Sequence, residues 1–250
     1  MEKMNRTYHA IGRKCKLVGG KATYFLFLRS KNGMKLMELK PGSYLDLELL
    51  RRRCLGYYDG TYHPCDSILK FPALRCSNCE EKHILKKCLQ CKGSCLLPRN
   101  VRRKFGADGE HIIYLVEFGK LLKVGVTKKG RVMERWLEQG ADAGCVLGSG
   151  NCEEMIGLER RLSTYYFASI PTEWKVKFLF YKGPVSMQDL RKYYTLPSPV
   201  SLFPYPKGKK LSGEILGVKG EILLLKRNGH CFWVDLDHLI GWEFTSQKLS

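Results

Sequence analysis

Two pairs of cysteines near the middle of the chain constrain its fold more than any other feature. They form the pattern Cys76-x2-Cys79-x8-Cys88-x2-Cys91. Each C-x2-C pair can direct two thiolates from one tight turn onto a tetrahedral ion, so two pairs can close a structural zinc site. Cys95, separated from Cys91 by three residues, is an alternative fourth ligand. A shell of four cysteines leaves no open position for water or substrate, so we expect this zinc to act in folding.

The remaining cysteines are expected to be thiols or metal ligands. The first fifteen residues, MEKMNRTYHAIGRKC, contain no apolar core of the kind that marks a secretory signal. We therefore expect a cytoplasmic protein, in a reducing compartment where disulfides are rare. Cys54, Cys65 and His63 are candidates for part of a second metal site, although Cys65 could instead pack in a core.

The net charge of the chain favours a polyanionic partner. Lys and Arg number 43 against 24 Asp and Glu, a formal net charge of +19. Such an excess attracts nucleic acid, and it is concentrated early in the chain: residues 1–110 hold 23 basic and 10 acidic side chains. No apolar run approaches the ~18 residues of a spanning helix, so we expect no membrane role.

Several short basic runs are candidates for contacts with phosphates of a nucleic acid. Single charge runs are more often solvated surface, and it is their joint abundance that supports this interpretation. The candidates are Arg102, Arg103, Lys104, Lys128, Lys129 and Arg131, and the run Arg51, Arg52 and Arg53 has the same character.

Hydrophobic patterns predict β-hairpins in three parts of the chain. Residues 22–40 and 214–236 each contain two strand-like runs around an Asn-Gly turn, which supplies the positive φ values of a tight hairpin. Residues 112–118 and 121–126 are apolar runs separated by Gly119 and Lys120. The Pro-rich stretch 194–210 cannot sustain a helix or a central strand and is expected to be a linker.

Helical patterns follow the central hairpin. Apolar residues after Lys128 recur at helical spacing, and Gly140 is well placed to end that helix. A second helix is predicted over about 152–167, followed by a strand at 174–183. The expected organisation is an N-terminal β module (1–53), a cysteine-rich zinc module (54–110), an α/β core (111–193), the linker (194–210) and a C-terminal β segment (211–250).

The segment HIIYLVEFGKLLKVGVTKKGRVMERWLEQGA, residues 111–141, resembles the core of the GIY-YIG nuclease superfamily. Ile112-Ile113-Tyr114 takes the place of the first tripeptide and Lys123-Val124-Gly125 that of the second. Arg135 follows as in the superfamily's first helix, and Gln139 stands where many members have His or Tyr. The resemblance covers residues 111–183 and implies an α+β fold, a small mixed sheet flanked by helices.

The resemblance also implies a catalytic site. Tyr114 would activate a water, Arg135 would stabilise charge on the phosphate, and Glu159 would bind Mg²⁺ or Mn²⁺. Lys123 replaces the superfamily's second tyrosine. The C-terminal Asn of the superfamily cannot be assigned to any residue of this chain. Lys123 could favour an ionised Tyr114, or it could bind phosphate in a protein that no longer cleaves.

Helical geometry gives independent weight to Glu159. At 100° per residue it falls within an apolar arc formed by Met155, Ile156, Leu158, Leu162 and Tyr166. A carboxylate at such a position requires compensation, either by a functional cation or by a neighbouring Arg or Lys in a structural ion pair.

Three functions follow from the sequence. The first is a zinc-containing nucleic-acid-binding protein that cleaves phosphodiesters with a divalent metal. The second is an inactive relative that binds structured RNA or a ribonucleoprotein. The third is a zinc-dependent scaffold that binds an acidic protein partner. The strings KVGVT, RW, EQGA and GVKG also resemble an uncharacterised prokaryotic family that places a cysteine-rich module before such a core.

Overall fold

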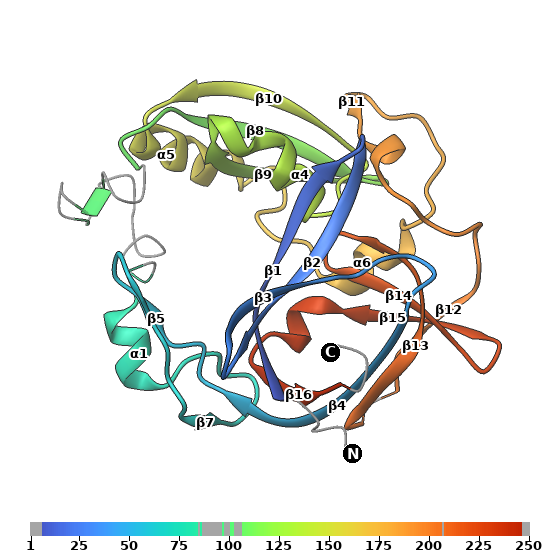
Figure 1. The fold of residues 1–250 in the computed structure, drawn as a ribbon. Coiled ribbons are helices and arrows are strands. Elements are labelled where there is room, and N and C mark those ends of the chain that lie inside the picture. The colour runs from blue at the N-terminus through green and yellow to red at the C-terminus, as the bar shows by residue number, and fades with distance from the viewer. Residues whose placement is uncertain are drawn as a thin grey trace, which may run out of the picture. The chain divides into compact units, whose positions relative to one another are not determined.

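The computed structural model describes residues 7–84, 86, 97, 101–102, 107–206 and 208–246. The chain forms two compact units (Figure 1). The first unit comprises residues 1–55, 64–76 and 192–250, and the second comprises 56–63 and 77–191. Both α and β elements are present and strands predominate, so the predicted α+β class is confirmed at this level.

The first unit is built on a ten-stranded sheet with the strand order β12-β15-β14-β13-β4-β16-β1-β2-β3, and β7 pairs with β4 beside this path. Most neighbours are antiparallel; β12 and β15 are parallel. The strands are β1 (Thr7–Val18), β2 (Lys21–Ser30), β3 (Gly33–Glu38), β4 (Tyr44–Arg53), β7 (Ile68–Leu69), β12 (Leu202–Pro204), β13 (Lys210–Lys219), β14 (Ile222–Arg227), β15 (His230–Asp235) and β16 (Trp242–Thr245).

Two predicted hairpins are confirmed in this sheet. Strands β2 and β3 pair around the turn at Lys31 and Asn32, and β14 and β15 pair around Asn228 and Gly229. Asn228 has φ 50° and Gly229 φ 79°, the left-handed conformation that an Asn-Gly turn supplies. The chain at both ends of the sequence therefore folds as the local pattern predicts.

The pairing between these hairpins differs from the predicted separate N- and C-terminal modules. β4 lies between β13 and β16, and β16 also pairs with β1, so both ends of the sequence share one sheet. Part of the expected linker is β12, an edge strand, where Pro204 is tolerated. These are pairings between distant segments, which local periodicity does not encode.

The second unit contains a four-stranded antiparallel sheet of order β11-β10-β8-β9. Its central hairpin was predicted at 112–118 and 121–126 and is confirmed. The strands are β8 (His111–Phe118), β9 (Leu121–Lys128), β10 (Ala143–Gly150) and β11 (Gln188–Asp189), and a short ribbon is formed by β5 (Tyr57–Tyr58) and β6 (Tyr62–His63).

Two helices follow the hairpin where the sequence predicts them, although the second ends at Leu162 and not near residue 167. After the 3-10 turn η1 (Lys129–Arg131), α4 (Val132–Glu138) ends before Gly140, whose φ of 72° is the left-handed conformation expected at a helix stop. α5 (Cys152–Leu162) begins with a capping box between Asn151 and Glu154. Its apolar side, with Met155 and Leu158, packs on Ile113 and Val124 of the hairpin.

The strand predicted at 174–183 is wrong. Residues 172–177 form the helix α6 (Thr172–Lys177), and turns follow it. Lys175 places its Nζ 4.6 Å from the centre of the Phe118 ring, and Leu179 is buried. Tertiary packing of these side chains outweighs the β-type pattern of the segment. The remaining short elements are α1 (Ser77–Lys82), η2 (Arg191–Tyr193) and η3 (Leu236–Leu239).

No helix in the described ranges is both long enough and apolar enough to cross a membrane.

Candidate functional site

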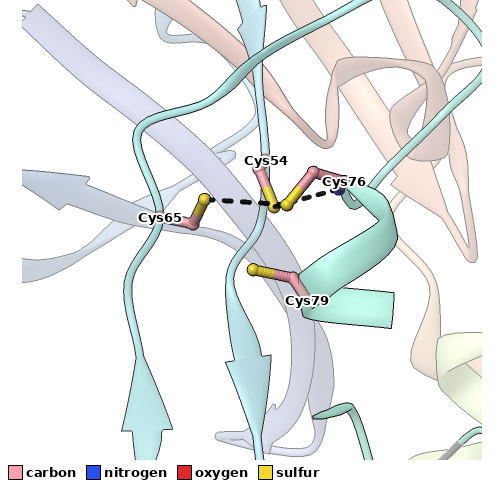
Figure 2. Close-up of side chains that lie close together, drawn as sticks. All are labelled: Cys54, Cys65, Cys76 and Cys79. Carbon is pink, nitrogen blue, oxygen red and sulfur yellow. Dashed lines mark hydrogen bonds between the residues drawn. The ribbon is translucent and has the colours of Figure 1, made fainter. Parts of the chain in front are cut away.

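Four cysteines gather at one point of the fold, with all four Sγ atoms within 4.8 Å of one another (Figure 2). Cys54 directly follows β4, Cys65 lies between β6 and β7, Cys76 precedes α1, and Cys79 lies in the first turn of α1. Because only two residues separate Cys76 and Cys79, that turn of helix brings both thiols to the same side.

The spacing of the sulfurs matches a tetrahedral metal shell. The Sγ atom of Cys76 lies 3.8 Å from that of Cys54 and 3.9 Å from that of Cys65. A tetrahedron with Zn–S bonds of about 2.3 Å has edges of about 3.8 Å. Cys54 and Cys79 are buried, and the backbone N–H of Cys76 donates to the Cys54 sulfur at 3.3 Å. The cluster could therefore hold a metal ion such as zinc.

The partners of Cys76 and Cys79 differ from those that the sequence predicted. Both residues belong to the cluster, but with Cys54 and Cys65. The predicted ligands Cys88, Cys91 and Cys95 lie outside the described residues. His63, a candidate for a second site, instead stacks on Tyr57 with 4.4 Å between ring centres, and its Nε2 donates a hydrogen bond to Asp59 Oδ1 at 3.1 Å.

A sequence signal for the observed cluster was present. Ten residues separate Cys54 from Cys65, and ten separate Cys65 from Cys76, so the four ligands read C-x10-C-x10-C-x2-C. The sequence also contains a second C-x2-C pair, Cys88 and Cys91, and two such pairs are the usual pattern of a zinc site. That pattern favoured the downstream cysteines as ligands over Cys54 and Cys65.

The second candidate site surrounds the hydroxyl of Tyr114 on β8. The ring is 1% exposed and packs edge-on against Trp136 of α4, with 6.2 Å between ring centres. Gly125 lies opposite Tyr114 in the β8–β9 register, and a methyl group there would overlap the Tyr114 hydroxyl. Gly125 is therefore required because the phenol occupies the space of its side chain. Gln139 Nε2 donates to the Tyr114 hydroxyl at 2.7 Å.

Opposing effects act on the ionisation of Tyr114. Burial raises its pKa above the usual value, and the Glu159 charge acts in the same direction. The charge of Arg135 and the hydrogen bonds from Gln139 and Arg135 favour the phenolate but do not outweigh the burial. Tyr114 is consequently a neutral phenol at pH 7.

Glu159 on α5 faces the same site. Burial raises the pKa of its carboxyl, although the charges of Lys123 and Arg135 and a backbone hydrogen bond from Val126 lower it. These contacts direct the carboxylate toward β9 and away from the solvent side of α5. Of the four residues that the sequence selected as one site, Arg135 and Glu159 thus act electrostatically on Tyr114, and Lys123 and Arg135 act on Glu159.

Arg135 and its neighbour Arg131 share an acidic partner. Arg135 Nη1 lies 3.4 Å from Glu138 Oε2, while Arg131 Nη2 lies 3.0 Å from Glu138 Oε1. The Arg135 side chain remains 44% exposed. Its guanidinium therefore reaches the buried hydroxyl of Tyr114 from a position that solvent, or a ligand, can approach.

The predicted phosphate-contact residues are spread over the second unit and several are ion-paired. Arg102 contacts Glu153 at 3.1 Å, and Lys129 contacts Glu110 at 2.8 Å. Lys128 is exposed at the end of β9. Arg103 and Lys104 lie outside the described residues. In the run Arg51, Arg52 and Arg53, the middle residue is buried and donates to the Ile240 carbonyl at 3.0 Å, a structural role.

Exposed aromatic side chains lie beside the strand that carries Lys123. Phe167 exchanges backbone hydrogen bonds of 3.0 Å with Leu122 and Val124, so it lies alongside β9. The Phe167 and Trp174 rings are 5.9 Å apart, and both are at least 40% exposed; Tyr165 is 82% exposed. No sequence pattern distinguishes this surface, because aromatic residues in an apolar pattern are typical of a core.

Comparison with known proteins yields one match. A family described as "Protein of unknown function (DUF2797)" matches residues 42–175, just over half of the 250-residue chain. The matched span includes the cysteine cluster and the site around Tyr114. No curated protein and no solved structure matches the chain.

Proposed function

We propose that this chain, which belongs to the DUF2797 family of unknown function, is a zinc-stabilised nucleic-acid-binding protein with a GIY-YIG-like, phosphodiester-cleaving site in its second unit. The observation that carries the proposal is the convergence of Tyr114, Arg135 and Glu159 with Lys123. They come from two strands and two helices, and all four belong to the resemblance over residues 111–183.

The chemistry of the site suits hydrolysis of a phosphodiester. The ionised oxygen of Tyr114 takes a proton from water, whose oxygen forms the new bond to phosphorus. The bond from phosphorus to the leaving sugar oxygen then breaks, and that oxygen takes up a proton from solvent. Arg135 neutralises charge on the phosphoryl oxygens in the transition state. Because Tyr114 must first lose its own proton, the rate should rise with pH across the neutral range.

Glu159 is suited to bind a divalent cation. Its raised pKa indicates that Lys123 and Arg135 do not fully compensate the buried carboxylate, so a further positive charge is favourable there. Mg²⁺ is commonly held by a single carboxylate together with water and substrate phosphates. Mg²⁺ or Mn²⁺ held in this way would add charge neutralisation at the phosphoryl oxygens.

Nucleic acid is the substrate class that the rest of the chain supports. The net charge of +19 favours a polyanion, and Lys123 forms a backbone bridge with Phe167, whose ring and that of Trp174 are exposed. Bases of a single strand stack on such rings independently of sequence. We therefore propose that the site acts on single-stranded or unpaired segments.

The test is a cleavage assay with Mg²⁺ or Mn²⁺ on single-stranded and duplex DNA and RNA. Glu159→Gln and Arg135→Ala are expected to reduce the rate by at least about a hundredfold, since each removes charge stabilisation of the transition state. The control is Glu173→Gln, an exposed carboxylate on α6. Cleavage that Glu159→Gln leaves unchanged would overturn the assignment of the site.

A second function, binding without cleavage, is favoured by the neutral state of Tyr114 and by Lys123. The Lys123 charge already acts on Glu159, in the place where a catalytic cation would act. In this case the site binds a phosphate of structured RNA or of a ribonucleoprotein and no bond is broken. Affinity should then fall steeply with salt, Lys123→Gln should weaken binding, and divalent cations should have little effect. Binding that is indifferent to salt would contradict this function.

We propose zinc as the ion of the cysteine cluster. The sulfur spacing and the donor set of four thiols suit zinc, whose structural sites are tetrahedral and rich in cysteine. The ion would stabilise the segment from Cys54 to Cys79, which contains few regular elements of its own. Elemental analysis should find a zinc ion bound at this cluster.

A further inference from the structure

A pocket of about 380 Å³ opens in the first unit, in the part of its sheet where β1, β2, β4 and β16 meet. No sequence pattern pointed to it. Its lining is dominated by ionisable side chains that come from all four strands and from the adjoining loops. These are His9, Arg29, Lys31, Arg53, Asp66 and Glu243.

Strand register explains why these side chains meet. His9 on β1 is the direct cross-strand partner of Arg29 on β2 and of Glu243 on β16. Cross-strand partners project from the same face of a sheet, so the three side chains form a row. Arg53 at the end of β4 reaches the row from the next strand, and its Nε lies 2.9 Å from Glu243 Oε1.

His9 is a buried polar group whose hydrogen bonds are not made within the protein. The residue is 3% exposed, and neither ring nitrogen makes a hydrogen bond of good geometry in the part of the chain that the structure describes; the Arg53 backbone is near enough only to raise the pKa of His9 slightly. Leaving such a group unsatisfied is costly, and buried histidines are normally bonded. Because His9 lines the pocket, a ligand there can make the hydrogen bond that the protein does not.

Positive charge exceeds negative charge around the pocket. Glu243 is held by two guanidiniums, Arg51 at 2.8 Å and Arg53 at 2.9 Å. Burial opposes its ionisation, but the hydrogen bonds from both arginines outweigh burial and lower the pKa of Glu243. The carboxylate of Glu243 is thus already compensated.

Asp66 occupies a different position, over the two arginines of the pocket. A single oxygen, Oδ1, lies 3.1 Å from Arg29 Nη2 and 3.2 Å from Arg53 Nη1, while the side chain is 81% exposed. The Arg29 and Arg53 side chains are only 15% and 18% exposed, so the exposed Asp66 carboxylate is the partner that a ligand can replace. Asp66 therefore marks the point between the guanidiniums where an oxyanion is bound most favourably.

We propose that this pocket binds a phosphate monoester, with its phosphate between Arg29 and Arg53 in the place of the Asp66 carboxylate. A tetrahedral oxyanion accepts more hydrogen bonds than a carboxylate, and the pocket offers two guanidiniums, the Lys31 ammonium and the unsatisfied ring of His9. The volume exceeds that of phosphate alone and lies in the range of small-molecule sites, so the phosphate is one end of a larger ligand.

Two sources carry this chemistry: a free phosphorylated metabolite of nucleotide size, and the 5′-phosphate end of a nucleic acid. The inference does not depend on the proposed nuclease site, because the residues of the pocket belong to the first unit alone. It also gives the first unit a binding role of its own, which the cleavage proposal leaves unassigned.

The experiment is titration of the full chain in a phosphate-free buffer with inorganic phosphate, adenosine 5′-monophosphate, adenosine, and a short oligonucleotide with and without a 5′-phosphate. Calorimetry gives the affinity, and the imidazole resonances in NMR report whether His9 is involved. Inorganic phosphate and the monophosphate should bind, and adenosine should not. If the oligonucleotide with a 5′-phosphate binds more tightly than the one without it, the ligand is the end of a nucleic acid. If only the free monophosphate binds, the ligand is a metabolite.

Two variants and a matched control test the assigned contacts. Arg29→Gln should weaken phosphate binding about tenfold, since it removes a charge-assisted hydrogen bond. Asp66→Asn should strengthen binding several-fold because it removes the competing carboxylate. Arg13→Gln is the control, because Arg13 also lies on this sheet and contacts an exposed aspartate, Asp237, at 2.5 Å, away from the pocket.

The result that would overturn the proposal is the absence of phosphate binding in both the unmodified protein and folded Asp66→Asn. Equal effects of Arg29→Gln and Arg13→Gln would do so as well, since binding would then follow net charge and not the pocket. Because Asp66→Asn removes only an exposed contact, its folding is not in question. Loss of cleavage in the second unit would leave each of these outcomes unaffected.

Discussion

The stability of the first unit should depend on pH through His9, and His9→Gln should remove that dependence. Burial, together with the Arg29 charge, lowers the pKa of His9 from 6.5 to about 4. The charge of Glu243 and the backbone of Arg53 oppose this, and the charge of Arg53 adds to it. Glutamine is neutral at every pH and still offers a donor and an acceptor. The variant therefore isolates the titration.

The difference in pKa between the folded and the unfolded chain sets the sign and the size of the change in the free energy of unfolding with pH. Because the folded-state pKa of His9 is the lower one, the unfolded chain binds the proton more tightly, and stability is lost as pH falls from about 6.5 toward 4. The pKa of His9 is lower in the folded chain by about 2.5, which corresponds to a loss of about 3 kcal/mol in the free energy of unfolding once His9 is fully protonated. Between pH 7.5 and pH 5, the free energy of unfolding should fall by about 2 kcal/mol more in the unmodified protein than in His9→Gln.

The assay is urea unfolding of both proteins at the two pH values, in acetate and MOPS buffers without phosphate. Protonation of other groups, including the clustered thiols, affects both proteins equally and cancels in the comparison. An NMR titration of the imidazole protons gives the pKa of His9 directly. Equal pH dependence in the two proteins, or a His9 resonance that titrates near 6.5, would refute the reasoning.

Three further predictions concern the second unit and the cysteine cluster. Gly125→Ala should destabilise the second unit by about 1–3 kcal/mol in thermal unfolding and displace Tyr114, whereas Gly130→Ala, with open space around its Cβ, should have little effect. Cys65→Ser should reduce bound zinc measured by elemental analysis, while Cys231→Ser, outside the cluster, should retain it; equal zinc in both would refute the cluster as its site. Asn151→Ala should cost about 1 kcal/mol in urea unfolding because α5 loses its capping box, and an unchanged midpoint would contradict that.

Local features of the fold were predictable from the sequence because they depend on neighbouring residues. Asn228 and Gly229 adopt the positive φ values that their turn requires, and Gly140 ends α4 as predicted. The 3.6-residue period placed the apolar side of α5 on the hairpin, and it placed Glu159 beside that side. In each case the physical cause lies within one element.

Features that depend on distant residues were not predictable in this way. The sequence joined Cys76 and Cys79 to a nearby pair, while the structure groups them with Cys54 and Cys65, because the chain after β4 returns to the same point. The row formed by His9, Arg29 and Glu243 exists only through pairing of β1 with β2 and β16. No periodicity in β1 distinguishes His9 from an ordinary strand residue.

The position of β4 between β13 and β16 has a consequence for synthesis on the ribosome. The two neighbours that flank β4 in the sheet, β13 and β16, are made late, since Lys210 follows Arg53 by 157 residues; only the short β7 pairs with the end of β4 earlier. The second unit lies mostly within that interval and can complete its sheet before β13 emerges. Strand β4 and the edge of β1 that pairs with β16 meanwhile stay unpaired, and such edges are prone to non-native association. The nascent chain is therefore most dependent on chaperones while the second unit is already folded.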